Sequence, residues 1–304
     1  MQSEKEYLSQ YKLGDYERPS VTTDVVAFMI RSEESGNYKR DSENRLSILL
    51  VKRGVHPYKD CWALPGGFLK PDETIEECAI REITGETSIT PVSLVPVGVF
   101  SEPGRDPRGW IISNAFFSII TEESVKQVGG DDASDAQWFD IFFEQTADGE
   151  YHLELEMRDF NQKESLIKNK DSINYQSENT GENHNENNNN DRSIRIDAVL
   201  TEGRTKFGKH IFNIKDNGGL AFDHAKIIAA ALTALRKSIR NFDIIFDFLP
   251  EKFTLNALQK VQETIMNISL LPANFRRKIN DYVEETDEFT QGAGHRPARL
   301  YTRK

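Results

Sequence analysis

The chain has 304 residues, 38% of them hydrophobic and 10% aromatic, so it can bury a sizeable core and is expected to form two domains. Apolar runs such as residues 227–235 fall well short of the roughly 20 residues of a membrane span, and the N-terminal segment has no apolar stretch typical of a secretion signal. Two cysteines exclude a disulfide framework, and no Cys/His spacing suits zinc, which favours a reduced, cytoplasmic setting.

The net charge of −11 argues at first against nucleic acid, but the charge is distributed unevenly. From Phe222 to the end there are 13 Lys and Arg against 10 Asp and Glu, a net of +3. The first 221 residues hold 25 against 39, a net of −14. The acidic charge therefore belongs to the front of the chain, and the tail permits DNA binding, which the position of its charges decides.

The first half alternates strand-like and helical patterns. Residues 21–30 and 46–53 are rich in β-branched and apolar residues and are predicted to pair as strands across a polar loop. A helix is predicted over residues 74–87, where Thr74 and Glu77 have capping-box spacing. Further strands are predicted at 94–100, 110–120 and 137–143. This order indicates an α/β layered domain.

The composition changes after a predicted strand at residues 151–157. Residues 174–193 are dominated by Asn, Glu and Ser and hold almost no apolar side chain, so they cannot offset the entropy cost of ordering. We predict a disordered insert over about residues 158–192, with strands resuming at 193–200 and 210–214.

The tail pattern is helical and ends in a hairpin. Helices are predicted at 223–240, at 254–266 with Thr254 as N-cap, and at 272–282 with Pro272 in the first turn. The apolar residues 242–248 are expected to cross between domains, and a Gly-containing wing follows at 288–303. A helix-turn-helix places its second helix in the DNA major groove. The expected division is an extension at 1–19, a first domain at 20–221, and a winged helix-turn-helix domain with its linker helix at 222–304.

The helix at 74–87 carries candidate phosphate chemistry. Gly66 and Gly67 precede it and permit close backbone turns, while Glu82 and Glu86 project from one face at i, i+4 spacing. Paired carboxylates suit Mg²⁺ or Mn²⁺, and Arg81 is placed to pair with a carboxylate. The alternative from the residues alone is an ordinary solvated helix with scattered charges.

The full string decides between these interpretations. Gly67, five residues, Glu73, seven residues, Arg81-Glu82-Ile83, then Glu86 and Ile89 resembles the Nudix box, Gly-x5-Glu-x7-Arg-Glu-U-x-Glu-Glu-x-Gly-U, where U is aliphatic. The resemblance implies a Nudix α/β/α sandwich whose box carboxylates bind metals that polarise a diphosphate and orient water. Gly85 stands where a Glu belongs and Ser88 where the Gly belongs. We therefore expect weakened metal binding and doubtful hydrolysis, although two carboxylates can still hold one ion.

A second ligand signal is the loop Ser-Glu-Pro-Gly-Arg-Asp-Pro-Arg-Gly-Trp at residues 101–110. Arg105 and Arg108 flank Asp106 in a constrained loop, and Arg offers bidentate donors to phosphate. The alternative is an exposed turn with solvated charges. The loop resembles the Pro-x-Arg-Asp-Pro-Arg-Gly segment of Nudix proteins that act on or bind ADP-ribose. In that fold Arg53 lies at a strand end facing the same cleft. The resemblance implies an ADP-ribose-like ligand.

The tail extends the resemblance. Leu220-Ala-Phe-Asp-His224, Phe253-Thr-Leu, Asn274-Phe-Arg-Arg-Lys278 and Gly294-His-Arg-Pro-Ala-Arg-Leu-Tyr301 resemble, in order, the tail of Nudix-related transcriptional regulators. The resemblance implies a Nudix sensor and a winged helix that binds operator DNA as a homodimer. The alternative for the basic residues alone is a solvated helix face. The candidate DNA contacts are Asn274, Arg276, Arg277, Lys278, Arg296 and Arg299.

Two functions follow as hypotheses. One is a DNA-binding regulator whose Nudix domain senses ADP-ribose or a related phosphorylated or sugar ligand. The other is a Mg²⁺-dependent Nudix hydrolase of the ADP-ribose pyrophosphatase type, with the tail as an accessory. Both use Glu82 and Glu86 as metal or catalytic contacts. The candidate ligand contacts are Arg53, Gly66, Gly67, Arg81, Arg105, Asp106 and Arg108.

Overall fold

The computed structural model describes residues 2–33, 43–121, 124–125, 136–157, 194–290 and 297–304. The predicted disordered insert at 158–192 and the candidate DNA contact Arg296 lie outside these residues.

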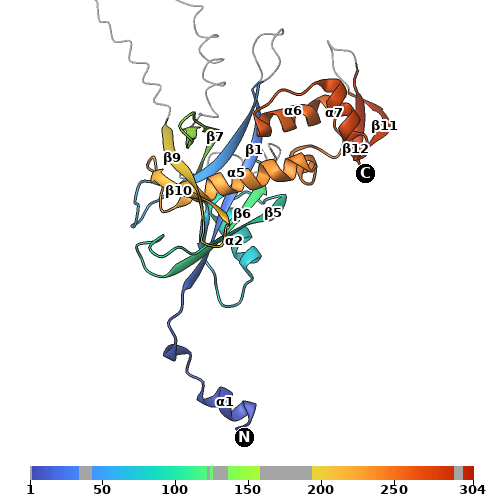
Figure 1. Ribbon diagram of the computed structural model, residues 1–304. Helices are drawn as coiled ribbons and strands as arrows, with labels where there is room; N and C mark the ends of the chain where they lie inside the picture. Colours follow the sequence, from blue (N-terminus) through green and yellow to red (C-terminus); the bar gives the residue numbers. More distant parts are fainter. Residues whose placement is uncertain (1, 34–42, 122–123, 126–135, 158–193, 291–296) are drawn as a thin grey trace, which may run out of the picture.

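A mixed sheet forms the centre of the molecule (Figure 1). Its main strands follow the order β10-β9-β8-β7-β2-β1-β6-β5, with β3 on β2 and β4 on β1. The strands β1 and β2 pair antiparallel as predicted, and β1 and β6 run parallel. The strand bounds are β1 Ser20–Glu33, β2 Glu43–Lys52, β3 Trp62–Ala63, β4 Gly66–Phe68, β5 Ser93–Phe100, β6 Ile111–Ile119, β7 Ala136–Gln145, β8 Glu150–Met157, β9 Arg195–Arg204 and β10 His210–Asp216.

Helices cover both faces of this sheet. Along β1 the side chains of Val25, Ala27 and Met29 belong to one apolar cluster, and those of Val26 and Phe28 belong to another. This alternation is the period of two that a strand requires when both its faces are buried. The first cluster packs against α2, Ile75–Thr87, and the second against α5, His224–Arg240. The predicted α/β/α sandwich is thereby confirmed.

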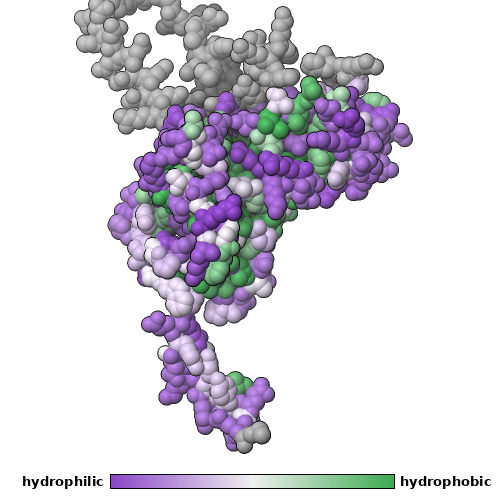
Figure 2. Space-filling model, in the orientation of Figure 1, coloured by the Kyte–Doolittle hydropathy of each residue, from purple (hydrophilic) through white to green (hydrophobic). Residues whose placement is uncertain are grey.

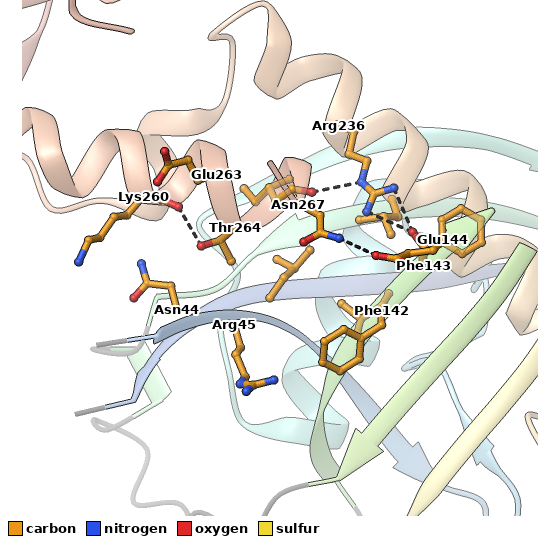
Figure 3. Close-up of a pocket in the computed structure, with 14 residues that line it drawn as sticks. Asn44, Arg45, Phe142, Phe143, Glu144, Arg236, Lys260, Glu263, Thr264 and Asn267 are labelled. Atoms are coloured by element: carbon orange, nitrogen blue, oxygen red, sulfur yellow. Dashed lines mark hydrogen bonds between the residues drawn. The ribbon is translucent and has the colours of Figure 1, made fainter. Parts of the chain in front are cut away.

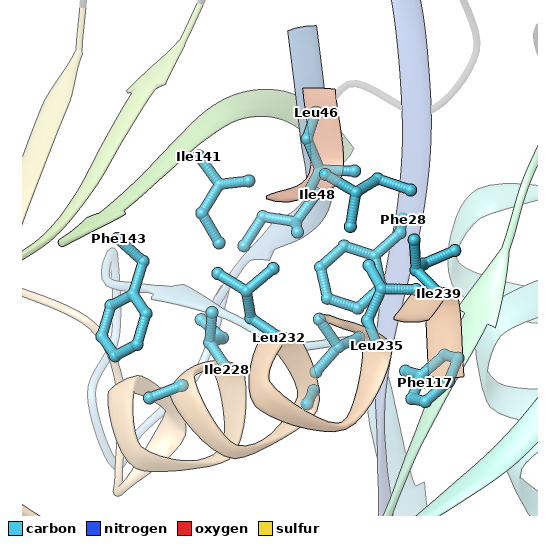
Figure 4. Close-up of a cluster of buried hydrophobic side chains, with 14 of the residues drawn as sticks. Phe28, Leu46, Ile48, Phe117, Ile141, Phe143, Ile228, Leu232, Leu235 and Ile239 are labelled. Carbon is cyan, nitrogen blue, oxygen red and sulfur yellow. The ribbon is translucent and has the colours of Figure 1, made fainter. Parts of the chain in front are cut away.

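The helix α5 belongs to the core of the sheet as well as to the tail. Ile228, Leu232 and Leu235 point from α5 toward the strands and are fully or almost fully buried (Figure 4). The same apolar cluster continues into the tail through Leu258 and Ile265. We predicted this segment as a linker helix; the structure shows one continuous core that runs from the sheet across α5 into the tail.

The tail folds as a helix-turn-helix followed by a two-stranded wing. After the short helix η2, Ile245–Phe248, come α6, Leu255–Met266, and α7, Pro272–Ile279, then β11, Val283–Phe289, and β12, Arg299–Arg303. Thr254 caps α6 as predicted, because its hydroxyl accepts a hydrogen bond from the Ala257 amide at 3.1 Å. The helix α7 ends three residues earlier than predicted. The chain turns after Ile279, and the Tyr282 amide donates a hydrogen bond to the Ile279 carbonyl.

The N-terminal extension stands apart from this body (Figures 1 and 2). It contains α1, Glu4–Gln10, whose capping box joins Ser3 and Glu6, and the short helix η1, Leu13–Asp15. No residue of α1 is buried. Among the described residues, no helix is long and apolar enough to cross a membrane.

Candidate functional site

The helix α2 begins with the predicted capping box and ends in the backbone conformation for which the box pattern has a glycine. At its start the Thr74 hydroxyl accepts from the Glu77 amide, and the Glu77 carboxylate accepts from the Thr74 amide at 2.7 Å, which confirms the predicted capping box. At its end Ser88 adopts the left-handed conformation, with φ of 57°. That conformation favours glycine. The substitution at this position is therefore accommodated with backbone strain.

The two glycines before α2 allow very close packing. A Cβ atom on Gly67 would lie 2.3 Å from Oε1 of Glu82, and one on Gly66 would lie 2.1 Å from the carbonyl oxygen of Thr23. The amide of Gly66 also donates to the Glu86 carboxylate at 3.2 Å. A larger residue at either position would displace these groups. The two glycines therefore allow the carboxylates of α2 to lie close to the strand β4.

Arg81 pairs with carboxylates, as predicted, and orders the box. Its guanidinium makes a bidentate contact with Glu73, at 2.8 and 2.6 Å, and donates to Glu82 at 2.6 Å. These bonds lower the pKa of Glu73 to about 2 and raise the pKa of Arg81. The geometry gives Arg81 a positioning role toward Glu82, and direct contact with a ligand stays a prediction.

Glu82 and Glu86 form the acidic end of the site. Although Glu86 as a whole residue is exposed, the protein around its carboxyl desolvates that group and raises its pKa to about 7, and the nearby negative charges of Glu82 and Asp24 add to this rise. No group of three or more His, Cys, Asp or Glu side chains that could hold a metal ion occurs in the described part of the chain. Two carboxylates nevertheless suit one Mg²⁺, which usually takes one or two carboxylates together with phosphate oxygens and water. Glu82 and Glu86 are the residues that would hold it.

The position of the missing box carboxylate is open. Gly85 is exposed, and a Cβ atom there would meet no other atom within 4 Å. Gly85→Glu is therefore expected to be tolerated and to raise Mg²⁺-dependent hydrolysis of ADP-ribose at least about tenfold, because it restores a charge-stabilising ligand. AMP release measures the effect. Gly85→Ala is the matched control, since it gives the same gain of roughly 1 kcal/mol in helix propensity without a carboxylate. Equal rates for the two variants would show that Gly85 does not limit hydrolysis.

A second part of the site brings two arginines onto one aromatic ring. The guanidinium carbon of Arg53 lies 4.8 Å from the centre of the Phe222 ring, and that of Arg108 lies 5.1 Å from the same ring. Arg108 also lies 5.0 Å from the ring of Phe68, and Tyr58 packs on Phe222 at 4.8 Å. Burial lowers the pKa of Arg53, and the positive charge of Arg108 lowers it further. A phosphate group between these guanidinium groups would relieve their repulsion.

The loop between β5 and β6 holds the predicted anion-binding residues in two different ways. Asp106 is buried and accepts from Arg108 at 2.7 Å; although burial alone raises the pKa of Asp106, this bond lowers it overall. Arg105 is also buried, and its Nε and Nη2 donate to the Asp223 carboxylate at 3.0 and 2.7 Å. Arg108 thus lies against the rings of Phe68 and Phe222, while Arg105 ties the loop to the start of α5. A ligand contact for Arg105 stays a prediction.

His224 joins the start of α5 to the box. Its Nδ1 accepts from the buried amide of Leu64 at 2.9 Å, and its Nε2 lies 3.5 Å from Asp24. The sequence predicts no site role for Phe222 or His224, which belong to a string that resembles the tail of Nudix-related regulators. The string Leu220-Ala-Phe-Asp-His224, next to an apolar helix, was the available signal.

The buried His224 makes stability depend on pH. Burial lowers its pKa in the folded state, whereas the unfolded side chain titrates near pH 6.5. As the pH falls, the unfolded state takes up the proton first, so the contribution of His224 to the free energy of unfolding falls by up to about 1.4 kcal/mol per pH unit below about pH 7. Denaturation in urea between pH 5 and 7 measures this slope. His224→Asn, whose oxygen can still accept from Leu64, is expected to flatten it relative to the wild type and to the exposed control His56→Asn. An unchanged slope in His224→Asn would contradict this assignment.

The candidate nucleic-acid interface is the outer face of α7. Arg276, Arg277 and Lys278 are exposed, while Phe275 and Ile279 are buried against the rest of the tail. Asn274 is exposed and accepts from Arg277 at 3.4 Å. On the wing, the predicted contact Arg299 forms an ion pair with Glu285. Among the candidate DNA contacts that the structure describes, the exposed positive charges on α7 are those of Arg276, Arg277 and Lys278.

Comparisons with known proteins agree with this arrangement. A family model described as the NUDIX domain matches residues 34–142, and one described as the NrtR DNA-binding winged helix domain matches residues 245–302. The chain is 26% identical to the "ADPR responsive transcriptional repressor NtrR" of Acinetobacter baylyi, over 98% of this chain and 88% of that protein. It is 39% identical to the "ADP-ribose pyrophosphatase" of Methanocaldococcus jannaschii, over 45% of this chain and 70% of that protein.

A solved structure supports the fold over the whole length. The MutT/nudix family protein from Enterococcus faecalis superposes with a TM-score of 0.61 at 25% identity, covering 100% of this chain and 94% of that one. Together with the box geometry of α2 and the helix-turn-helix of the tail, these matches establish that the chain belongs to the Nudix family and joins a Nudix domain to a DNA-binding winged helix domain of the NrtR type.

Proposed function

We propose that this protein is a transcriptional regulator whose binding to operator DNA responds to ADP-ribose or a related phosphorylated ligand. The observation that carries the proposal is the basic outer face of α7, attached through one continuous core to a Nudix domain in which two arginines lie on one aromatic ring. The A. baylyi relative, which aligns over almost the whole chain, is named as an ADPR-responsive repressor.

The ligand would bind between Arg53 and Arg108. Both guanidinium groups lie against the Phe222 ring, where a diphosphate can accept hydrogen bonds from each. The rings of Phe68 and Tyr58 are partly exposed beside them and offer stacking surfaces for a base. This set of charged and aromatic groups suits a nucleoside diphosphate such as ADP-ribose.

A hydrolase is the second candidate, because Glu82 and Glu86 remain in the box and the M. jannaschii relative is named an ADP-ribose pyrophosphatase. Proteins of this family typically use a divalent metal. Here we infer weak binding of Mg²⁺ by these two carboxylates, where it would stabilise charge on a diphosphate. The open position at Gly85 and the strained Ser88 favour recognition of the ligand over its turnover.

The proposed regulator works as a homodimer in the cytoplasm. Two α7 helices related by a two-fold axis would read a palindromic operator in successive major grooves. Cys61 and Cys78 are both free, in keeping with a reduced compartment.

One experiment separates the two candidates. The full chain is incubated with ADP-ribose and Mg²⁺, and both AMP release and binding to DNA from upstream of its own gene are followed. The regulator predicts salt-sensitive, sequence-selective DNA binding that ADP-ribose changes, with little AMP. Rapid turnover without selective DNA binding would overturn it in favour of the hydrolase.

A further inference from the structure

The segment that starts α5 is hydrogen-bonded to the residues just before the box glycines. The amide of Ala221 donates to the carbonyl of Trp62 at 2.9 Å, and His224 accepts from the Leu64 amide at 2.9 Å. Residues 220–224, called here the coupling turn, therefore lie beside the strand that leads to the box glycines. Phe222 within it has φ of 51°, a left-handed conformation that costs free energy for a residue other than glycine. Such a conformation persists only where its surroundings impose it.

The coupling turn contacts both parts of the site that would meet a phosphorylated ligand. The Phe222 ring carries Arg53 and Arg108, and the next residue, Asp223, holds Arg105 of the β5–β6 loop through two hydrogen bonds. One turn further along α5, Lys226 bonds to Glu102 of the same loop at 2.8 Å. The first turn of α5 is thus bonded at two points to the loop that carries Arg108.

The other end of α5 holds the winged helix. Arg236 donates from Nε to the carbonyl oxygen of Ile265 in α6, at 3.1 Å, and from both terminal nitrogens to that of Phe143 in β7, at 3.4 Å (Figure 3). Nearby, Asn267 donates to Glu144 at 2.7 Å. These bonds lie at the wall of a cavity of about 590 Å³ between the sheet and α6. The sheet and α6 are therefore joined here by a few hydrogen bonds beside an open space, into which side chains can repack.

The helix α5 can carry a displacement between its two ends. It is an uninterrupted helix of 17 residues, about 25 Å long, whose residues 224–229 are all buried and whose later turns are buried along one side. Interfaces of this kind change between discrete packed arrangements because close-packed side chains do not deform continuously.

We propose that the coupling turn transmits occupancy of the cleft to the winged helix. A diphosphate that draws the guanidinium groups of Arg53 and Arg108 toward its oxygens changes their packing on Phe222 and shifts the loop held by Asp223. The first turn of α5 follows, and Arg236 and the shared core move α6 and α7 with it. The ligand favours one of two arrangements because its contacts with the two arginines differ between them. This inference rests on the proposed function.

The test measures coupling separately from binding. The dissociation constant for upstream DNA is determined without and with saturating ADP-ribose, and their ratio is the coupling factor. A factor of about 5 to 150, in either direction, is expected for the wild type. Asp223→Asn is expected to reduce the factor to less than twofold while leaving DNA affinity without ligand within about threefold of the wild type, because Asp223 stands at the end of α5 opposite the end at which Arg236 bonds to α6. Phe222→Leu keeps an apolar residue but removes the ring, and the same loss of coupling is expected at saturating ligand.

The controls make the outcomes distinct. Asp197→Asn and Phe207→Leu repeat the same chemical changes at exposed sites on β9 and its turn, and should keep the wild-type coupling factor. A wild type whose DNA affinity ignores ADP-ribose would overturn the proposed function and this inference together. If ADP-ribose changes the DNA affinity of the wild type and changes it equally in Asp223→Asn and Phe222→Leu, the role of the coupling turn is overturned and the proposed function stands.

A second measurement guards against variants that fail to fold. Amide hydrogen exchange of the wild-type protein is recorded with and without ADP-ribose. Changes in protection at residues 220–226 and also in α6 are expected. Changes confined to the box and the β5–β6 loop would overturn the proposed transmission.

Discussion

Replacing Arg276 and Arg277 together by alanine is expected to weaken binding to upstream DNA by about 30-fold or more. Both side chains project from the exposed face of α7, and each contact to a base edge is worth about 1–3 kcal/mol. The fold should survive, because Phe275 and Ile279 hold the other face of the helix in the core. Fluorescence anisotropy with labelled DNA measures the loss, and contacts to phosphates would also reduce the salt dependence by about one unit each.

The matched control removes two positive charges elsewhere. Lys206 and Lys209 are exposed at the β9–β10 turn, and replacing both by alanine should leave DNA affinity within about threefold, since only general charge is lost. Binding of ADP-ribose should be unchanged in both double variants. Equal losses of DNA affinity would mean that α7 is not the reading helix.

Leu235→Ala is expected to lower the free energy of unfolding by about 2–5 kcal/mol. The side chain is fully buried where the sheet and α5 meet, in the cluster that continues into the winged helix (Figure 4). The cavity left by the substitution should therefore destabilise both parts in a single transition. Urea denaturation followed by circular dichroism measures the change.

The control for this variant is Leu8→Ala, at a side chain that is 61% exposed in the N-terminal extension. Its effect should remain within about 0.5 kcal/mol, as is usual for surface substitutions. If Leu235→Ala unfolded the winged helix in a separate, earlier transition, the shared core would not act as one cooperative unit.

Much of the fold followed from local chemistry. The capping pair Thr74 and Glu77, the N-cap Thr254 and the β-branched runs all specify structure over a few residues, and the helix and strand positions agree with them. The inward placement of Phe275 and Ile279 agrees with their i, i+4 spacing on one face of α7. The Nudix box was similarly local, because its carboxylates lie on one helix.

The parts that could not be predicted depend on contacts between distant segments. Arg105 and Arg108 have the same chemistry in the same loop, but the side chain of Arg105 is buried in an ion pair with Asp223, 118 residues away, whereas Arg108 pairs locally with Asp106 and lies on the rings of Phe68 and Phe222. The role of Phe222 likewise arises only when the chain folds back beside Trp62. The spacing of apolar residues in α5 also did not predict that this helix packs against the sheet as well as against the tail.

The most direct test of the central claim is a titration of the protein–DNA complex with ADP-ribose. The complex is formed on upstream DNA at fixed salt, with EDTA present so that metal-dependent hydrolysis cannot remove the ligand, and its dissociation constant is followed by anisotropy. The account predicts a saturable change of at least about fivefold, with AMP and ribose 5-phosphate as ineffective controls. A dissociation constant that stays the same at saturating ADP-ribose, with binding of the ligand verified by calorimetry, would contradict it.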